Sequence, residues 1–219
     1  MKTYDKMSNE EQIIYNKQLI EKYPFLYPRY AFSGEKVEDY DYTYTELDAL
    51  PTGWRIAFSE LICEDIKNEL IKYDYLDKYQ ILQIKEKWGA LRWYDNGTPQ
   101  GCKVDDIISA YSVLSEYICI YCGQLNVPMI DDSWISPACE DCYVNKYNYY
   151  FDTDKTVLMQ KRQKFWDKCY EDQYPITLPT TRSYRQYKPD SNEWELIIVD
   201  ISEYTNKIIN KYIELNYEN

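Results

Sequence analysis

Cysteine is the residue type with the clearest potential for chemistry in this chain, because four of the seven cysteines form two Cys-x-x-Cys pairs. The first pair is Cys119 and Cys122, and the second is Cys139 and Cys142. The sixteen residues 123–138 separate the pairs, a spacing typical of two tight turns that direct four sulfurs to one point. Gly123 supplies the permissive backbone that such a turn often uses. The pattern predicts a tetrahedral site for one zinc ion.

The chain contains no histidine, so the ligands of such a site must all be thiolates. Four thiolates around Zn²⁺ leave no coordination position for water, and we therefore expect the ion to support folding and not catalysis. The same absence excludes Ser-His-Asp and Cys-His catalysis and histidine general bases. Aspartate and glutamate are numerous but form no recognisable catalytic pair. The sequence predicts a protein that is not an enzyme.

Two other interpretations of the paired cysteines stay open. They could be reduced core residues or a redox site, although thioredoxin-type sites carry one Cys-x-x-Cys motif and not two. A zinc deaminase motif is excluded, because one residue separates Pro137 from the second pair and no His-x-Glu or Cys-x-Glu partner lies upstream. Outside the pattern lie Cys63, Cys102 and Cys169; Cys63 and Cys169 fall on apolar helix faces, which predicts burial.

The charge of the chain is strongly acidic. Its 219 residues include 25 Lys and Arg against 37 Asp and Glu, which gives a formal net charge of -12. This balance opposes nucleic-acid binding by the free protein, because basic residues must neutralise the phosphates. The first residues are polar, and no stretch approaches the roughly 18 apolar residues of a membrane helix. An odd number of cysteines, seven, does not suggest a disulfide scaffold. We expect a soluble, cytoplasmic protein without a membrane partner.

Hydrophobic periodicity predicts the elements that must position the cysteines. The fold class is α+β: helices packed on a small antiparallel hairpin, an embedded four-cysteine zinc ribbon and a C-terminal helical extension. Helices are expected at 9–22 behind a Ser8–Glu11 capping box, from Gly53 to Tyr73, at 104–117, at 155–170 and beyond a Ser202 cap; strands are expected at 79–88, 91–94 and 194–199.

Composition divides the chain into three segments. Residues 1–52 hold an N-terminal helix and a long acidic, tyrosine-rich loop, and residues 53–150 hold the helix, hairpin, second helix and zinc ribbon. Residues 151–219 form a C-terminal α+β extension, with a composition change near residue 150 that suggests a boundary between lobes.

The long connection 24–52 is a candidate binding surface, since unstructured loops of this length tend to be functional or flexible. In it three tyrosines alternate with acidic residues, which predicts an extended segment with one aromatic edge beside dense negative charge. The candidate partner-binding residues are Glu38, Asp39, Tyr40, Asp41, Tyr42 and Tyr44. The alternative is a solvated acidic loop whose tyrosines fold back onto the core.

The hairpin from Ile84 to Tyr94 mixes basic and aromatic residues, as nucleic-acid-binding sheets do. Its surroundings are acidic, which favours another interpretation. We expect an amphipathic hairpin in which Trp88 and Trp93 pack inward while Lys87 and Arg92 face water.

Several of these motifs resemble a family of bacteriophage and prophage zinc-ribbon proteins. The resemblance covers roughly residues 23–143, and its most specific part is the hairpin Ile-Lys-Glu-Lys-Trp-Gly-Ala-Leu-Arg-Trp-Tyr. Its other parts are Tyr23-Pro24 with Leu26, Leu50-Pro51-Thr52-Gly53-Trp54, Leu61 to Ile66 with Cys63 and Glu64, Leu114-Ser115, Cys119 to Gly123 and Trp134 to Cys142. The resemblance implies a phage origin and a place in the bacterial host cytoplasm, and it brings no catalytic residues. Family members commonly end soon after the second cysteine pair, so it implies nothing about the later residues.

By analogy with zinc-containing anti-CRISPR proteins, the resemblance implies an inhibitor that binds a host defence nuclease of the Cas9 type and blocks DNA loading. The acidic charge would steer the protein to the basic nucleic-acid channel of such a nuclease. The alternative is a phage zinc-ribbon protein that binds nucleic acid or regulates transcription through Lys85, Lys87 and Arg92.

Overall fold

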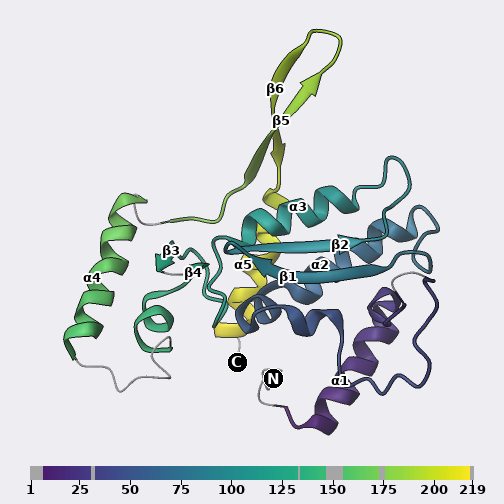
Figure 1. Cartoon of the computed structure of the whole chain (residues 1–219), viewed down its shortest axis with the longest axis horizontal. Helices are drawn as coiled ribbons and strands as arrows, with labels where there is room; N and C mark the ends of the chain where they lie inside the picture. Colours follow the sequence, from purple (N-terminus) through teal and green to yellow (C-terminus); the bar gives the residue numbers. More distant parts are fainter. Residues whose placement is uncertain (1–6, 31–32, 133, 147–154, 173–175, 218–219) are drawn as a thin grey trace.

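The computed structural model describes residues 7–30, 33–132, 134–146, 155–172 and 176–217. These residues form an α+β fold in which helices accompany two-stranded antiparallel sheets, and the predicted fold class is confirmed. Figure 1 shows the elements in order: α1 (Asn9–Lys22), η2 (Pro24–Leu26), η3 (Glu46–Ala49), α2 (Thr52–Ile71), β1 (Ile81–Lys87), β2 (Ala90–Asp95), α3 (Val104–Ser115), β3 (Met129–Asp132), β4 (Trp134–Pro137), η4 (Cys142–Lys146), α4 (Lys155–Glu171), β5 (Thr181–Lys188), β6 (Glu193–Asp200) and α5 (Ser202–Tyr217).

Helix α1 begins at its predicted residue because a capping box satisfies its first backbone donors. The Ser8 hydroxyl accepts the Glu11 N–H at 3.3 Å, and the Glu11 carboxylate accepts the Ser8 N–H at 2.7 Å. The helix ends at Lys22 because Tyr23 precedes a proline, and that position disfavours helical backbone.

Helix α2 is the central element of the main core. It is surrounded by strands β1 and β2 and by helices α3 and α5. The buried side chains of the main core come from all three predicted segments, the N-terminal, the middle and the C-terminal one. The core includes Leu178, Ile201 and Ile208 from beyond residue 150. The predicted boundary near residue 150 itself lies outside the described residues. The largest fully buried side chains of α2 are Trp54, Phe58, Ile62, Ile66 and Leu70.

The hairpin of β1 and β2 is confirmed, with Lys87 opposite Ala90. Trp88 and Gly89 form its two-residue turn, and both have positive φ, 59° and 74°, as a type I′ turn requires. Trp93 points into the core as expected. The prediction that Trp88 packs inward is wrong, because the turn lies beyond the last strand pair and leaves this side chain 65% exposed.

Arg92 does not face water freely, which also differs from the prediction. The side chain is half-buried because its guanidinium lies against α3, where it donates hydrogen bonds to the Leu91 carbonyl at 3.0 Å and to Ser112 Oγ at 3.3 Å. Lys87 is exposed, as expected. Only one of the two predicted basic positions therefore projects into solvent.

The C-terminal part adds a second small core and a separate hairpin. Helix α4 packs on β3 and η4, with Phe165 and Cys169 buried against Ile130 and Tyr143. Strands β5 and β6 form a hairpin that stands away from the rest of the molecule (Figure 1). Helix α5 is confirmed, but Ser202 is its first residue, and the Asp200 carboxylate accepts the Ser202 N–H at 2.8 Å.

No helix in the described part of the chain combines the length and apolar character needed to cross a membrane.

Candidate metal centre

The side chains of Cys119, Cys122, Cys139 and Cys142 converge, and their four sulfur atoms lie within 4.8 Å of one another. Three of them are buried and Cys122 is half-exposed. The Sγ atoms of Cys122 and Cys139 are 3.6 Å apart, close to the edge of about 3.8 Å in a tetrahedron of sulfurs around zinc. The four cysteines could hold a metal ion, as the spacing predicts.

A tight reversal of the chain at residues 118–125, the first knuckle, positions Cys119 and Cys122. An isolated β-bridge joins Ile118 to Leu125, and the Cys119 N–H donates to the Gln124 carbonyl at 2.8 Å. The Gly123 N–H then donates back to the Cys119 carbonyl at 2.9 Å. Gly123 has a φ of +80°, which side-chain-bearing residues rarely adopt, so glycine is needed here.

The second knuckle, residues 137–143, follows the hairpin of β3 and β4. Cys139 lies two residues beyond Pro137, the last residue of β4, and its carbonyl accepts the Tyr143 N–H at 2.9 Å. Cys142 is the first residue of η4. The two knuckles are joined directly, because the Ile120 N–H donates to the Pro137 carbonyl at 3.0 Å. We call residues 118–143 the cysteine ribbon.

The N-terminus of α2 is docked into the first knuckle. The Gly53 N–H donates to the Ile120 carbonyl at 2.8 Å, and Trp54 Nε1 donates to the Ile118 carbonyl at 2.9 Å. A Cβ atom on Gly53 would lie 2.0 Å from the carbonyl oxygen of Cys119, so only glycine fits. Hydrophobic periodicity places Gly53 at a helix start but cannot reveal this contact. The one sequence signal for the contact is the run Pro51-Thr52-Gly53 directly before a tryptophan.

The turn of the β1–β2 hairpin rests against the other side of the cysteine ribbon. A Cβ atom on Gly89 would lie 2.4 Å from Met129 Sδ and 3.3 Å from Pro137 Cδ. The ribbon is thus held by α2 at its first knuckle and by this turn at the β3–β4 hairpin.

The four sulfurs are too close together to ionise equally without a cation. Hydrogen bonds from the thiols of Cys122, Cys139 and Cys142 hold the pKa of Cys119 well below its usual value. Hydrogen bonds to Cys119, Cys122 and Cys139 instead raise the pKa of Cys142 well above the usual value. A divalent cation at this site would supply the positive charge that allows all four thiolates to form.

The cysteines outside the ribbon behave differently. Cys63 and Cys169 are buried, as expected, and Cys102 is half-exposed. Burial raises the pKa of the Cys63 thiol far above its usual value, so this group stays protonated.

The six predicted partner-binding residues lie on one loop, but the segment is not extended as predicted. Positive φ angles at Asp39 and Tyr42, 54° and 64°, turn the chain twice. The rings of Tyr40 and Tyr42 lie 4.7 Å apart by their centroids and pack against the main core. The acidic side chains are exposed, and the hydroxyl of Tyr40 donates to the Tyr44 carbonyl. The exposed members are Glu38, Asp39, Asp41 and Tyr44.

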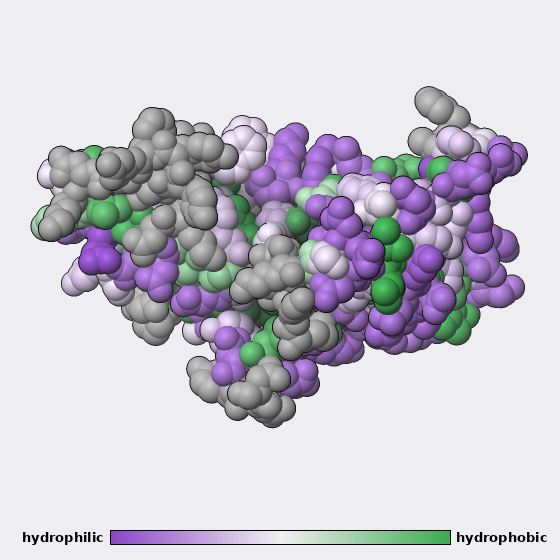
Figure 2. Space-filling model, turned by 90° about the horizontal axis from the view of Figure 1, so that it is seen from below, coloured by the Kyte–Doolittle hydropathy of each residue, from purple (hydrophilic) through white to green (hydrophobic). Residues whose placement is uncertain are grey.

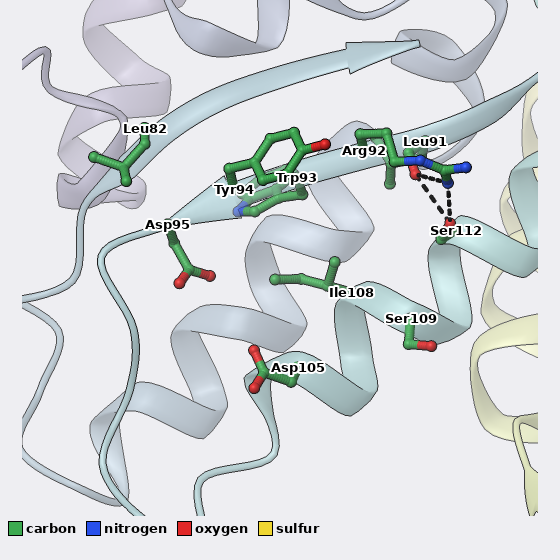
Figure 3. Close-up of a pocket in the computed structure, with 10 residues that line it drawn as sticks. All are labelled: Leu82, Leu91, Arg92, Trp93, Tyr94, Asp95, Asp105, Ile108, Ser109 and Ser112. Atoms are coloured by element: carbon green, nitrogen blue, oxygen red, sulfur yellow. Dashed lines mark hydrogen bonds between the residues drawn. The ribbon is translucent and has the colours of Figure 1, made fainter. Parts of the chain in front are cut away.

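Of the three basic residues of the alternative function, Arg92 lines a groove of about 480 Å³ between β2 and α3 (Figure 3), whereas Lys85 and Lys87 do not. Arg92 lies at one end of this groove, while Asp95 and Asp105 lie at the other. Burial, with Asp95 and Asp106 nearby, raises the pKa of Asp105. Lys85 lies over the ring of Tyr94, 5.1 Å from its centroid. This mixture of charges differs from the continuous basic track that a phosphate backbone requires.

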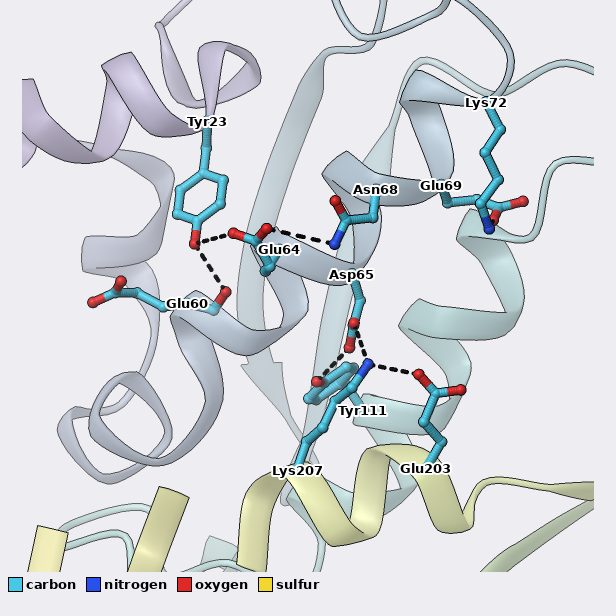
Figure 4. Close-up of polar contacts among 10 residues, drawn as sticks. All are labelled: Tyr23, Glu60, Glu64, Asp65, Asn68, Glu69, Lys72, Tyr111, Glu203 and Lys207. Atoms are coloured by element: carbon cyan, nitrogen blue, oxygen red, sulfur yellow. Dashed lines mark hydrogen bonds and ion pairs between the residues drawn. The ribbon is translucent and has the colours of Figure 1, made fainter. Parts of the chain in front are cut away.

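A polar network that the sequence did not reveal joins α5 to α2 and α3 (Figure 4). The Asp65 carboxylate accepts a hydrogen bond from the Tyr111 hydroxyl at 2.8 Å and pairs with Lys207 Nζ at 2.5 Å. Lys207 also pairs with Glu203 at 2.7 Å. Every member of this set has a partner, which is typical of a structural network.

Comparisons with protein-family models, with curated proteins and with solved structures gave no match. The resemblance to phage zinc-ribbon proteins therefore stays a prediction.

Proposed function

We propose that the cysteine ribbon binds one Zn²⁺ ion and that this ion has a structural role. The observation that carries the proposal is the convergence of four sulfurs, three of them buried, in a chain without histidine. Thiolates are soft ligands and a tetrahedral set of four favours zinc or an iron–sulfur centre, and zinc needs no further component. With all four positions taken by protein, no site is left for a reacting water.

The ion would stabilise a surface and not carry out a reaction. Backbone hydrogen bonds tie the first knuckle to Gly53 and Trp54 of α2, so the metal cross-links a ribbon that is already part of the fold. Binding energy at such a site is folding energy. We therefore propose that the protein acts by binding a partner, without catalysis.

The proposed partner is a host defence nuclease of the Cas9 type, whose loading with DNA the protein would block. The support for this proposal is electrostatic: the net charge is -12, and Glu38, Asp39 and Asp41 are exposed on one loop. The face drawn in Figure 2 is largely hydrophilic, with hydrophobic residues in small groups. A basic nucleic-acid channel would attract the net negative charge and the exposed carboxylates of this loop from a distance.

Metal content tests the first part of the proposal. We expect one zinc per chain by elemental analysis, and we expect Cys139→Ser to lose the metal and to unfold at a lower temperature. Cys102→Ser is the matched control, because that half-exposed thiol lies outside the ribbon and should change neither quantity. Full zinc content in Cys139→Ser would contradict the proposed site.

A cleavage assay tests the second part. Purified protein should slow target loading by a Cas9-type complex at low salt, and the effect should weaken as salt rises. The double variant Glu38→Gln and Asp39→Asn should weaken inhibition more than Glu10→Gln and Glu21→Gln, which remove the same charge from exposed positions of α1. Asp41 is left unchanged because its carboxylate holds Thr43 in the loop.

Two results would contradict the inhibitor proposal. One is a protein that neither binds nor inhibits the nuclease at low salt. The other is a gel shift of free DNA or RNA that is lost when Lys87 and Arg92 are replaced, which would favour the nucleic-acid-binding alternative.

A further inference from the structure

The hairpin of β5 and β6 leaves an unusual amount of apolar surface uncovered. Its eight pairs run in register from Thr181 opposite Asp200 to Lys188 opposite Glu193. Near its base the Arg182 guanidinium pairs with Asp106 of α3 at 2.6 Å, while the remainder projects away from the molecule (Figure 1). A two-stranded hairpin alone is marginally stable in water. Pairing with a further strand would stabilise the part of this hairpin that projects from the molecule.

One face of the hairpin carries a row of exposed apolar side chains from β6, and most of the charged side chains lie on the opposite face, together with Tyr184, Ile197 and Val199. Directly opposed residues share a face, so Trp194, Leu196 and Ile198 lie beside Tyr187, Arg185 and Ser183. The three β6 side chains are 65%, 59% and 66% exposed. On the opposite face Lys188 pairs with Glu195 at 2.6 Å. Strand β6 therefore presents a row of apolar side chains beside a free edge, which no described strand pairs with. A free strand edge of this kind is the usual template for strand addition.

The sequence of β6 is complementary to itself when a second copy is placed antiparallel with Leu196 opposite Leu196. Trp194 then faces Ile198 of the second copy, and Trp194, Leu196 and Ile198 of both copies stay on one side of the joined sheet because the shift is even. Glu193 faces Val199, and Glu195 faces Ile197. No carboxylate stands directly opposite another carboxylate, so the register has no like-charge pair of the kind that destabilises a sheet.

We propose that β6 binds β6 of a second copy of this chain, giving a continuous four-stranded antiparallel sheet with a twofold axis at Leu196. One strand edge and three pairs of apolar contacts make a small, isologous interface. The dimer is therefore weak and depends on concentration. Because the two β6 strands run antiparallel, the main cores of the two copies lie at opposite ends of the shared sheet. Both cysteine ribbons therefore lie outside the interface.

The first test is sedimentation equilibrium on the full chain across micromolar to millimolar concentrations. The wild type should pass from monomer to dimer. Leu196→Glu places two carboxylates opposite each other and should raise the dimer dissociation constant at least about tenfold. Ser183→Glu adds the same charge to an exposed position of the outer strand β5, opposite Ile198, and should change it less than about twofold. A wild type that stays monomeric, or a Leu196→Glu dimer of unchanged strength, overturns the proposal.

The second test maps the axis by cross-linking. Opposed Cα atoms in antiparallel strands lie about 4.5–5.5 Å apart, within the range that a disulfide spans. Leu196→Cys should form a covalent dimer on mild oxidation, and Tyr187→Cys, on the same face of β5, should not exceed the wild-type background. Equal cross-linking of the two variants, or capture of a different protein by a wild type that remains monomeric, overturns the self-pairing.

Discussion

The indole Nε1 of Trp54 donates a hydrogen bond of 2.9 Å to the carbonyl of Ile118, the residue before the first of the four clustered cysteines. Both groups are buried, and the bond spans 64 positions of the sequence. It connects the central helix of the main core to the backbone that directs Cys119 into the four-cysteine cluster. The geometry of the cysteine ribbon therefore depends on residues far from it in the chain.

Trp54→Phe should weaken this connection while keeping an aromatic ring in the core. The Ile118 carbonyl loses its buried donor, and an unsatisfied group of this kind lowers the free energy of unfolding by about 1–3 kcal/mol. Chemical denaturation measures this loss, and zinc titration should show weaker metal binding in the same variant. Trp88→Phe is the control, because that side chain is 65% exposed. Equal stability of the two variants would argue against the role of the bond.

Gly53→Ala should be among the most damaging small substitutions in the chain. The added methyl group would lie 2.0 Å from the Cys119 carbonyl oxygen, so either α2 or the first knuckle must move. We expect a loss of about 3 kcal/mol or more in the free energy of unfolding, together with reduced zinc affinity.

Gly97→Ala separates steric contact from backbone strain in that experiment. Gly97 has a φ of 86°, but a Cβ atom there would meet no atom within 4 Å. The expected loss is only the strain of a left-handed residue, about 1–2 kcal/mol. If Gly53→Ala were no worse than Gly97→Ala, the close docking of α2 on the first knuckle would be refuted.

Trp88→Asn should stabilise the protein. Trp88 occupies a left-handed turn position with a φ of 59°, which asparagine adopts more readily than tryptophan. Since the indole is mostly exposed, little packing is lost, and the free energy of unfolding should rise by about 0.5–1 kcal/mol. Trp134→Asn, at a 55% exposed strand position, should give no gain. A thermal melt that falls for Trp88→Asn would show that the indole has a packing role.

Alkaline pH should unfold the protein together with ionisation of its buried tyrosines. Burial raises the pKa of Tyr15, Tyr23 and Tyr111 well above 10.0, and carboxylates beside all three raise it further. A raised pKa in the native state means stability that is present below pH 10 and is lost as the pH rises above it, where the unfolded chain ionises first. Tyrosinate absorbance and circular dichroism should therefore change together above pH 10. A gradual absorbance change in a protein that stays folded would contradict this prediction.

Local sequence signals predicted most elements because each has a local cause. The capping box at Ser8 and Glu11 begins α1, the proline after Tyr23 ends it, and the paired cysteine spacing locates the metal site. These features depend on residues a few positions apart, which a sequence displays directly.

The features that the sequence did not reveal depend on tertiary contacts. Alternation predicted an extended acidic loop, but the rings of Tyr40 and Tyr42 pack at a tilt against each other and against the main core, and the chain turns at Asp39 and Tyr42. Trp88 was expected inside because tryptophan is apolar, yet the two-residue turn places it outside. The Asp65–Lys207 ion pair joins residues 142 positions apart, beyond any local pattern.

The positions of the metal ligands also bear on the order in which the chain folds. All four ligands lie between residues 119 and 142, whereas the main core needs residues from Leu19 to Ile208. Closing a short loop is fast and costs less entropy than bringing distant segments together. During synthesis all four cysteines leave the ribosome before Leu178, Ile201 and Ile208 do. Capture of the proposed zinc ion would therefore precede completion of the core, and zinc supply during translation would set how much of the chain reaches its native state.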